Sequence, residues 1–307
     1  MKNPMFSIVI ATYDRPELLS RTVSTILRAF EGRGAIEIIV VDDCSTKPLP
    51  DFSSQSVVVV RTPTNGGPGP ARMLGLRMAR AQWAVVFDDD DMMTDNAFAV
   101  LTTAIREPGA DRFLVHMFRT SNGSLDPSVQ VGCLEDYILG RVRGDFTALV
   151  NVAPFLAANL SYPPISIGGE HLLWWTIARD YGGIRFWAER LETKMADAPS
   201  RLTHAQTQIT KAEQHHRLAC TTLERFGHDL LRIEPGVFDR VSHARLAYAA
   251  LAGKREEARR AWRALRPGFA KAVLAPAPYL PRSLLAWSFL CLRRYSEARA
   301  NSMAAST

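Results

Sequence analysis

The chain has 307 residues, 47% of them hydrophobic, so it can bury a large α/β core and is not a disordered protein. Its net charge of +6, from 37 Lys and Arg against 31 Asp and Glu, is too small to indicate a nucleic-acid partner and agrees with anionic substrates or an anionic membrane surface. The four cysteines form no CxxC pair, which argues against a disulfide framework or a zinc site and favours a reducing compartment.

The beginning of the chain leads directly into a strand pattern, so we expect no signal peptide. No apolar run reaches the roughly 18 residues that a membrane-spanning helix needs. We therefore expect a cytoplasmic protein, with peripheral attachment to the inner face of the cytoplasmic membrane as a further option.

The first hundred residues alternate between strand and helix patterns. Short runs rich in β-branched residues predict buried strands over 6–11, 36–41, 57–60 and 83–87. Helical spacing predicts one helix that begins near Pro16 and another over about 71–80. This order is typical of a doubly wound, mostly parallel sheet, in which ligands bind beyond the carboxyl ends of the strands. Polar clusters follow three of these strands, namely Tyr13-Asp14, Asp42-Asp43 and Asp88 to Asp91.

Four consecutive aspartates, Asp88 to Asp91, follow the fourth predicted strand. Like charges repel, so such a run favours a nearby cation, and oxygen ligands suit Mg²⁺. Arg72 lies in the first predicted turn of the helix that follows a glycine-rich loop at 65–70, where backbone N–H groups favour phosphate oxygens. Together these residues indicate a metal-bound nucleoside diphosphate. The alternatives are a solvated turn that caps a helix at 88–91, a strand-end cap at Asp42 and Asp43, and a surface charge at Arg72.

The segments FSIVIATYDRPELLSRTVSTIL, IEIIVVDDCST, NGGPGPARMLGLRMA and WAVVFDDDD occur in this order within residues 6–105. They resemble the nucleotide-binding half of inverting family 2 glycosyltransferases, which have the GT-A fold. The resemblance implies that Tyr13 and Asp43 contact the nucleobase and ribose and that Arg72 faces the nucleotide. In the matching DXD motif, Asp88 lies near the ribose and Asp90 binds Mn²⁺ or Mg²⁺.

The resemblance extends these roles to neighbouring residues. The implied nucleotide-binding set is Ala11, Tyr13, Asp14, Arg15, Asp42, Asp43, Asn65, Gly66, Gly67, Arg72, Asp88 and Asp89. The implied metal ligands are Asp90 and Asp88, joined by His204, which matches a short Arg-x-x-His-like segment of the family.

The sequence Gly168-Gly169-Glu170-His171 departs from the family, which commonly has Gly-Glu-Asp with the aspartate as general base. By this register His171 takes the base position, and Glu170 is the alternative. Both side chains can accept a proton from an acceptor hydroxyl. A third interpretation is that catalytic competence is altered.

The function implied is metal-dependent inverting transfer of a sugar from a nucleoside-diphosphate sugar, with a UDP-sugar as first choice. The acceptor is a hydroxyl of a glycan or lipid-linked glycan in surface polysaccharide synthesis. The alternatives are a non-catalytic or altered sugar-nucleotide-binding protein and a nucleotidyltransferase; the latter needs a glycine-rich basic loop after the first strand, where Thr12 to Arg15 stand.

We expect a GT-A domain over 1–200, with a nucleotide-binding half at 1–105 and an acceptor half at 106–200, and a helical extension over 201–307. Within that extension, two helices should meet at Gly253. A short apolar segment at 283–292 has arginines on both sides, so residues 270–295 are a candidate for contact with a membrane interface. Packing on the transferase domain or on a second subunit of a homo-oligomer is the alternative.

Overall fold

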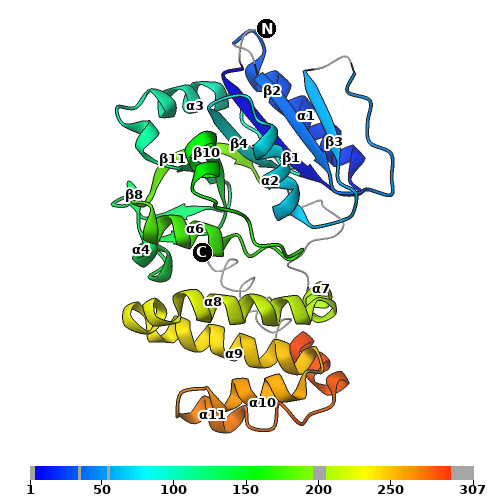
Figure 1. Ribbon diagram of the computed structural model, residues 1–307, viewed down its shortest axis with the longest axis vertical. Coiled ribbons are helices and arrows are strands. Elements are labelled where there is room, and N and C mark those ends of the chain that lie inside the picture. Colours follow the sequence, from blue (N-terminus) through cyan, green and yellow to red (C-terminus); the bar gives the residue numbers. More distant parts are fainter. Residues whose placement is uncertain (1–3, 34–35, 54–55, 196–204, 292–307) are drawn as a thin grey trace, which may run out of the picture. The chain divides into compact units, whose positions relative to one another are not determined.

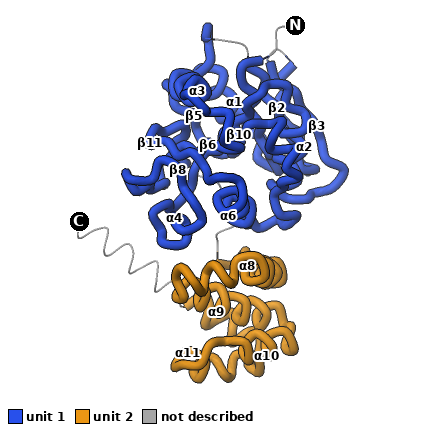
Figure 2. Tube along the Cα trace, turned by 60° about the vertical axis from the view of Figure 1, so that its left-hand side comes forward, with its two compact units in different colours: residues 1–198 blue, residues 199–307 orange. Residues whose placement is uncertain are grey.

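The computed structural model describes residues 4–33, 36–53, 56–195 and 205–291. The chain divides into two compact units, Met1–Ala198 and Pro199–Thr307 (Figure 2). The first unit is an α/β domain and the second is helical, and each is described by itself below.

The first unit is built on a nine-stranded sheet in the order β3-β2-β1-β4-β10-β6-β11-β5, with β8 paired to β11 (Figure 1). Its strands are β1 Phe6–Thr12, β2 Ile36–Asp42, β3 Val57–Arg61, β4 Trp83–Asp88, β5 Met92–Met93, β6 Val115–Thr120, β8 Val131–Gly132, β10 Phe146–Asn151 and β11 Ile184–Thr193. A separate two-stranded sheet pairs β7 Ser124–Leu125 with β9 Val142–Arg143. The helices are α1 Pro16–Phe30, α2 Pro68–Met78, α3 Ala97–Arg106, α4 Leu134–Ile138, α5 Val152–Ala157 and α6 His171–Asp180.

Strands β3, β2, β1 and β4 are parallel, as the sequence predicts. The pairing places Thr12 beside Asp42 and Ala11 beside Asp88. The carboxyl ends of these strands therefore meet at one edge of the sheet, which is where a doubly wound fold binds its ligands. Beyond β4 the sheet becomes mixed, because β10 runs antiparallel to both β4 and β6.

Apolar residues cover both faces of the sheet. Ile8 and Ile10 of β1 pack in one cluster with α1 and α3, whereas Val9 packs in another with α2, α5 and α6. Successive side chains of a strand point to opposite faces, so the near-continuous apolar run of β1 is what a sheet covered on both sides needs. The core thereby fixes the strand ends on which the polar clusters stand.

Helix α2 differs from the prediction because it begins at Pro68 and ends at Met78, rather than spanning about 71–80. Pro68 and Pro70 fall within its first turn, where a backbone N–H has no partner inside the helix, so prolines are tolerated there. Gly67 precedes it with φ +88, and a Cβ at this position would lie 2.7 Å from Ser166 Cα. Arg72 is consequently the fifth residue of the helix and not part of its first turn.

The second unit consists of packed helices. These are α7 Ala205–Thr210, α8 Ala212–Ile233, α9 Pro235–Leu251, α10 Arg255–Arg263 and α11 Phe269–Val273, and residues 282–291 are also helical. Leu246 and Ala249 of α9 pack with Ala258 and Ala261 of α10. Gly253 lies between these two helices with φ +76, which confirms the predicted turn. Among the described residues, no helix is both long and apolar enough to cross a membrane.

Candidate active site

The glycine-rich loop is fastened to the sheet by Asp43, which directly follows β2. The Asp43 carboxylate accepts hydrogen bonds from Gly66 N at 3.0 Å, Gly67 N at 2.7 Å and Thr62 Oγ1 at 3.1 Å. The residue is only 3% exposed. Asp43 therefore sets the shape of the loop that precedes α2, a role that the sequence alone did not indicate.

The turn after β1 is fixed in a similar way. Asp14 has φ +56, and its carboxylate accepts hydrogen bonds from the backbone N–H groups of Thr46 and Lys47. These bonds, led by that of Lys47, lower the pKa of Asp14. The neighbouring Tyr13 is 42% exposed. A partly exposed aromatic residue thus stands at the edge where β1 and β2 end.

Three of the predicted nucleotide-binding residues have hydrogen-bond or ion-pair partners within the protein, namely Asp42, Arg15 and Asp89. Asp42 is 2% exposed and accepts hydrogen bonds from Ser45 N and Arg61 Nη1, which agrees with the strand-end cap. Arg15 Nη1 lies 3.0 Å from Asp89 Oδ1 and 3.1 Å from Asp90 Oδ2. The other predicted positions stand nearby: Ala11 is half-buried beside Asp88, and Asn65 is exposed in the loop.

Arg72 connects the end of β4 to the start of α6. Its Nη1 lies 2.5 Å from Glu170 Oε1, and its Nη2 lies 2.6 Å from Asp88 Oδ1. The side chain is 13% exposed. Burial by itself would lower the pKa of Arg72, but the carboxylates of Asp88 and Glu170 outweigh it and raise that pKa. Arg72 is therefore a fixed positive charge between two carboxylates that are far apart in sequence.

The four consecutive aspartates occupy four different environments. Asp88 accepts from Arg72 and also from Lys194 Nζ at 2.7 Å; burial would raise its pKa, but these two cations lower it. Asp89 is 5% exposed and accepts from Thr12 Oγ1, and burial raises its pKa to about 6.

Asp90 and Asp91 complete the run. Asp90, with a side chain that is 17% exposed, is paired with Arg15. Asp91 is 1% exposed and accepts from Lys194 Nζ and Met195 N, and burial raises its pKa. Within the run, Asp88 and Asp90 are thus the carboxylates that remain partly open.

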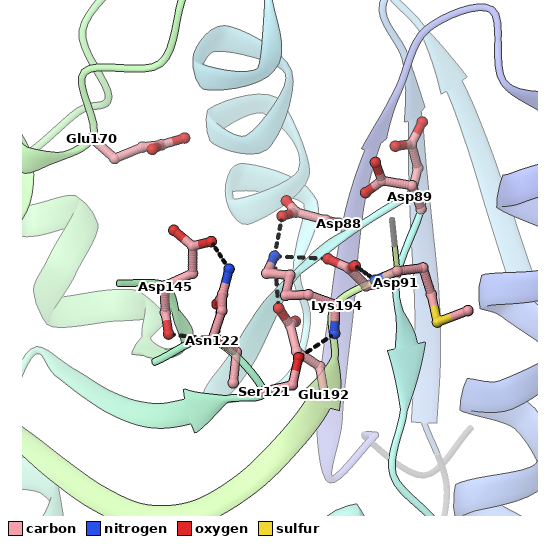
Figure 3. A network of polar contacts seen from close by, with 12 residues as sticks. Asp88, Asp89, Asp91, Ser121, Asn122, Asp145, Glu170, Glu192 and Lys194 are labelled. Atoms are coloured by element: carbon pink, nitrogen blue, oxygen red, sulfur yellow. Dashed lines mark hydrogen bonds and ion pairs between the residues drawn. The ribbon is translucent and has the colours of Figure 1, made fainter. Parts of the chain in front are cut away.

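Lys194 and Glu192 adjoin the aspartate run, and the sequence alone did not indicate them. Lys194 Nζ lies 2.7 Å from an oxygen of each of Asp88, Asp91 and Glu192 (Figure 3). In the described part of the chain, these three carboxylates form a group whose ligand atoms lie within 4.8 Å of one another. No motif marks the end of β11, so only the folded structure reveals the contact.

The two candidate bases stand in different surroundings. Glu170 precedes α6, its side chain is 38% exposed, and it contacts Arg72 as described above. His171 opens α6 and packs edge-on against Trp175, with ring centroids 5.1 Å apart. Burial lowers the pKa of His171 to about 4. Geometry therefore favours Glu170, whereas the family register places His171 first.

Two sequence predictions fall outside the described residues. His204, a predicted metal ligand, is one of them. The other is the last part, 292–295, of the segment with predicted membrane contact.

Residues 7–143 match the model of Glycosyl transferase family 2. The chain is 35% identical over 94 residues to the succinoglycan biosynthesis protein ExoO of Rhizobium meliloti (strain 1021), a match that covers 29% of this chain and 26% of that protein. It is 28% identical over 104 residues to the putative colanic acid biosynthesis glycosyl transferase WcaA of Escherichia coli (strain K12), covering 32% and 37%. The chain thus spans well under half the length of these curated relatives.

Solved structures resemble the chain over a greater length. Residues 1–349 of Staphylococcus aureus TarS, in complex with UDP-GlcNAc, align with a TM-score of 0.51 and 16% identity over 84% of this chain and 89% of that one. The mannosyltransferase PcManGT of Pyrobaculum calidifontis, in complex with GDP-Man and Mn²⁺, aligns with a TM-score of 0.55 and 14% identity over 99% and 84%. At such low identity the likeness concerns the fold, and it confirms the GT-A architecture expected from the sequence.

Proposed function

We propose that this chain, whose residues 7–143 match Glycosyl transferase family 2 and which resembles glycosyltransferases in fold, transfers a sugar from a nucleoside-diphosphate sugar to a hydroxyl acceptor with inversion at the anomeric carbon. The observation that carries the proposal is the pair of contacts made by Arg72. This one arginine binds both Asp88, at the end of β4, and Glu170, one of the two candidate bases. In this proposal, the nucleotide-binding residues and the proton acceptor lie together at the carboxyl edge of the parallel strands.

The nucleotide pocket in this proposal comprises Tyr13, the loop held by Asp43, and Arg72. The exposed Tyr13 ring offers a face on which a base can stack. The N–H groups of a glycine-rich loop that leads into a helix suit phosphate oxygens. UDP-sugars are our first choice of donor, since TarS is a relative in complex with UDP-GlcNAc; the GDP-Man of PcManGT is the second.

Asp88 and Asp90 are the residues that would hold Mn²⁺ or Mg²⁺, because they are hard oxygen ligands and remain partly open. Asp88 also contacts Arg72 and Lys194, and Asp90 contacts Arg15; carboxylate oxygens have lone pairs enough to keep these contacts. A bound divalent cation supplies charge neutralisation for the departing diphosphate. Arg72 contributes a second, permanent positive charge at the same end of the site.

In the transfer step, Glu170 accepts the proton of the acceptor hydroxyl, and the acceptor oxygen forms a bond to the anomeric carbon. The bond from that carbon to the diphosphate oxygen breaks on the opposite face, so the configuration inverts. The nucleoside diphosphate leaves with the electron pair. Relatives named for succinoglycan and colanic acid biosynthesis suggest a glycan or lipid-linked glycan as the acceptor.

We expect Asp43→Ala and Arg72→Ala each to weaken the binding of UDP by about 1–3 kcal/mol, which is the contribution of a lost charge-assisted hydrogen bond. Arg72→Ala would remove a direct contact with the nucleotide. Asp43→Ala would in addition free the backbone N–H groups of Gly66 and Gly67 from their hydrogen bonds, so the loop could change shape. Calorimetry with UDP and Mn²⁺ measures the effect. Asp95→Ala is the matched control, because Asp95 forms an exposed ion pair with Arg28 in the same domain. Normal UDP binding by both variants would contradict the proposed pocket.

The proposal includes contact between the helical unit and an anionic membrane that carries the acceptor. Large apolar side chains are exposed there: Phe269 at 86%, Tyr279 at 59% and Trp287 at 64%. Residues 258–291 contain no acidic residue and six basic ones, namely Arg259, Arg260, Arg263, Arg266, Lys271 and Arg282. Exposed aromatics among basic residues are typical of segments that lie in the interface of anionic membranes.

We expect the full chain to sediment with vesicles that contain anionic phospholipid and to stay in solution with neutral ones. Phe269→Ser together with Trp287→Ser should lower the bound fraction several-fold, since two exposed apolar anchors are lost. Val59→Ser is the control, because Val59 of β3 is 45% exposed on the other unit. If the wild-type chain ignores anionic vesicles, this contact is refuted while the transferase proposal stands.

A further inference from the structure

Lys194 is seated among carboxylates that come from three separate elements. Asp88 ends β4, Asp91 stands just before β5, and Glu192 belongs to β11. Asp91 and Glu192 are 1% and 2% exposed. Figure 3 shows the Lys194 side chain pointing into the pocket that these three residues form, with Asp89 lying apart from it.

The number of N–H donors of the Lys194 ammonium equals the number of carboxylates around it. A lysine ammonium has three N–H donors and no acceptor, and Nζ meets one oxygen of each carboxylate at 2.7 Å. Backbone hydrogen bonds fix its place, since Lys194 N donates to Ser121 Oγ and Met195 N donates to Asp91 Oδ1. The lysine is therefore held by the fold as well as by charge.

Three carboxylates packed this closely favour a bound cation when all of them are charged, and burial raises the pKa of Glu192 to about 7. Burying an unpaired charge is costly, and each like charge nearby adds to the cost. One oxygen atom of each carboxylate lies within 4.8 Å of those of the other two, and carboxylate oxygens are also the ligands that a hard divalent cation prefers. The ammonium and a metal ion would therefore compete for the same pocket, and Lys194 is the cation that the chain itself provides.

We propose that Lys194 is a positioning residue, an internal cation that fills the pocket of Asp88, Asp91 and Glu192 and keeps divalent cations out of it. Lys194 holds Oδ2 of Asp88 while Arg72 holds Oδ1, so the two cations orient this carboxylate before any ligand binds. The divalent cation of the transferase is thereby directed to the outer side of the aspartate run, at Asp90. This last consequence rests on the proposed function; the occupancy of the pocket does not.

The test uses the full chain and Mn²⁺ without any nucleotide. Lys194→Met leaves the three carboxylates without their cation, so we expect this variant to bind Mn²⁺ at least about tenfold more tightly than wild type in calorimetry. Its melting temperature should fall in EDTA and rise again with Mn²⁺, because a ligand that binds the folded state stabilises it. Wild type should show little response to Mn²⁺ in either measurement.

Two further variants make the result specific. Lys254→Met removes a lysine that also pairs with two carboxylates, Glu213 and Glu257, at the surface of the other unit, and it should gain no Mn²⁺ binding. Adding Glu192→Gln to Lys194→Met should recover the melting temperature in EDTA and abolish the gain, since one charge and one ligand are lost together. If Lys194→Met folds only with metal, the double variant can still be measured in EDTA and therefore keeps the proposal testable.

The proposal is overturned if Lys194→Met binds Mn²⁺ as wild type does and melts at the same temperature in EDTA and in Mn²⁺. A gain that persists in the double variant also overturns it, because the metal would then use other residues. Neither readout involves a nucleotide or a sugar. If wild type does not bind UDP, that result counts against the transferase proposal alone.

Discussion

Replacing Glu170 by glutamine should lower the turnover of sugar transfer by about 10²-fold or more, because a general base contributes roughly that factor to a proton transfer. Glutamine keeps the size of the side chain and an oxygen that can accept from Arg72. We therefore expect UDP affinity to stay near wild type, so that the loss appears in kcat rather than in nucleotide binding. Steady-state rates with a saturating donor, combined with calorimetry, measure both quantities.

His171→Ala is the companion variant, since it removes the neighbouring side chain to which the family register points. We expect only a modest loss of turnover, because the imidazole packs against Trp175 and burial has already weakened it as a proton acceptor. The reverse ranking, with His171→Ala inactive and Glu170→Gln active, would assign the base to His171 and keep the transferase proposal.

The pH profile distinguishes the same alternatives. The pKa of His171 is lowered to about 4, so its imidazole is already neutral above that pH and its titration cannot produce a fall in turnover between pH 7 and 6. A profile with an apparent pKa of about 6.5 would indicate a histidine base in an ordinary, solvated environment. If wild type binds a UDP-sugar but neither transfers nor hydrolyses its sugar, the alternative of a non-catalytic nucleotide-binding protein gains support.

The strands whose polar ends meet at the candidate site could be predicted, because strands and polar ends leave a local signal. The runs that became β1, β2 and β4 end at Thr12, Asp42 and Asp88, within a residue of the expected ends. Apolar periodicity and a change to aspartate are properties of consecutive residues, so a single sequence contains them. The start of α2 was misplaced by three residues because prolines at a helix start resemble loop residues.

The partners within the site could not be predicted, because they are long-range. Lys194 lies 106 residues from Asp88, and Glu170 lies 98 residues from Arg72. Nothing adjacent to Lys194 distinguishes it from a surface lysine, and its pairing depends on the register by which β11 joins the sheet. The hydrogen bonds of Asp43 could not be predicted either. They form because residues 62–67 fold over its carboxylate, which a single sequence does not reveal.

The second large effect concerns the metal. We expect UDP to bind wild type far more tightly with Mn²⁺ or Mg²⁺ than in EDTA, because Asp88 and Asp90 otherwise face the phosphates as anions. Asp90→Asn should abolish this difference and lower turnover by about 10²-fold or more, since a Lewis acid at a departing diphosphate is worth several kcal/mol. Calorimetry with UDP in each buffer, followed by rates at saturating donor, measures the two effects.

Asp89→Asn is the matched control for that experiment, because it makes the same chemical change one residue earlier. The Asp89 side chain is buried against Thr12 and Arg15, so its replacement should lower the melting temperature and leave the metal dependence of UDP binding in place. Equal UDP affinity of wild type with and without divalent cation would exclude the metal from donor binding. In that case Arg72 is the residue that would balance the charge of the diphosphate, and Arg72→Ala should then be the variant that loses UDP binding.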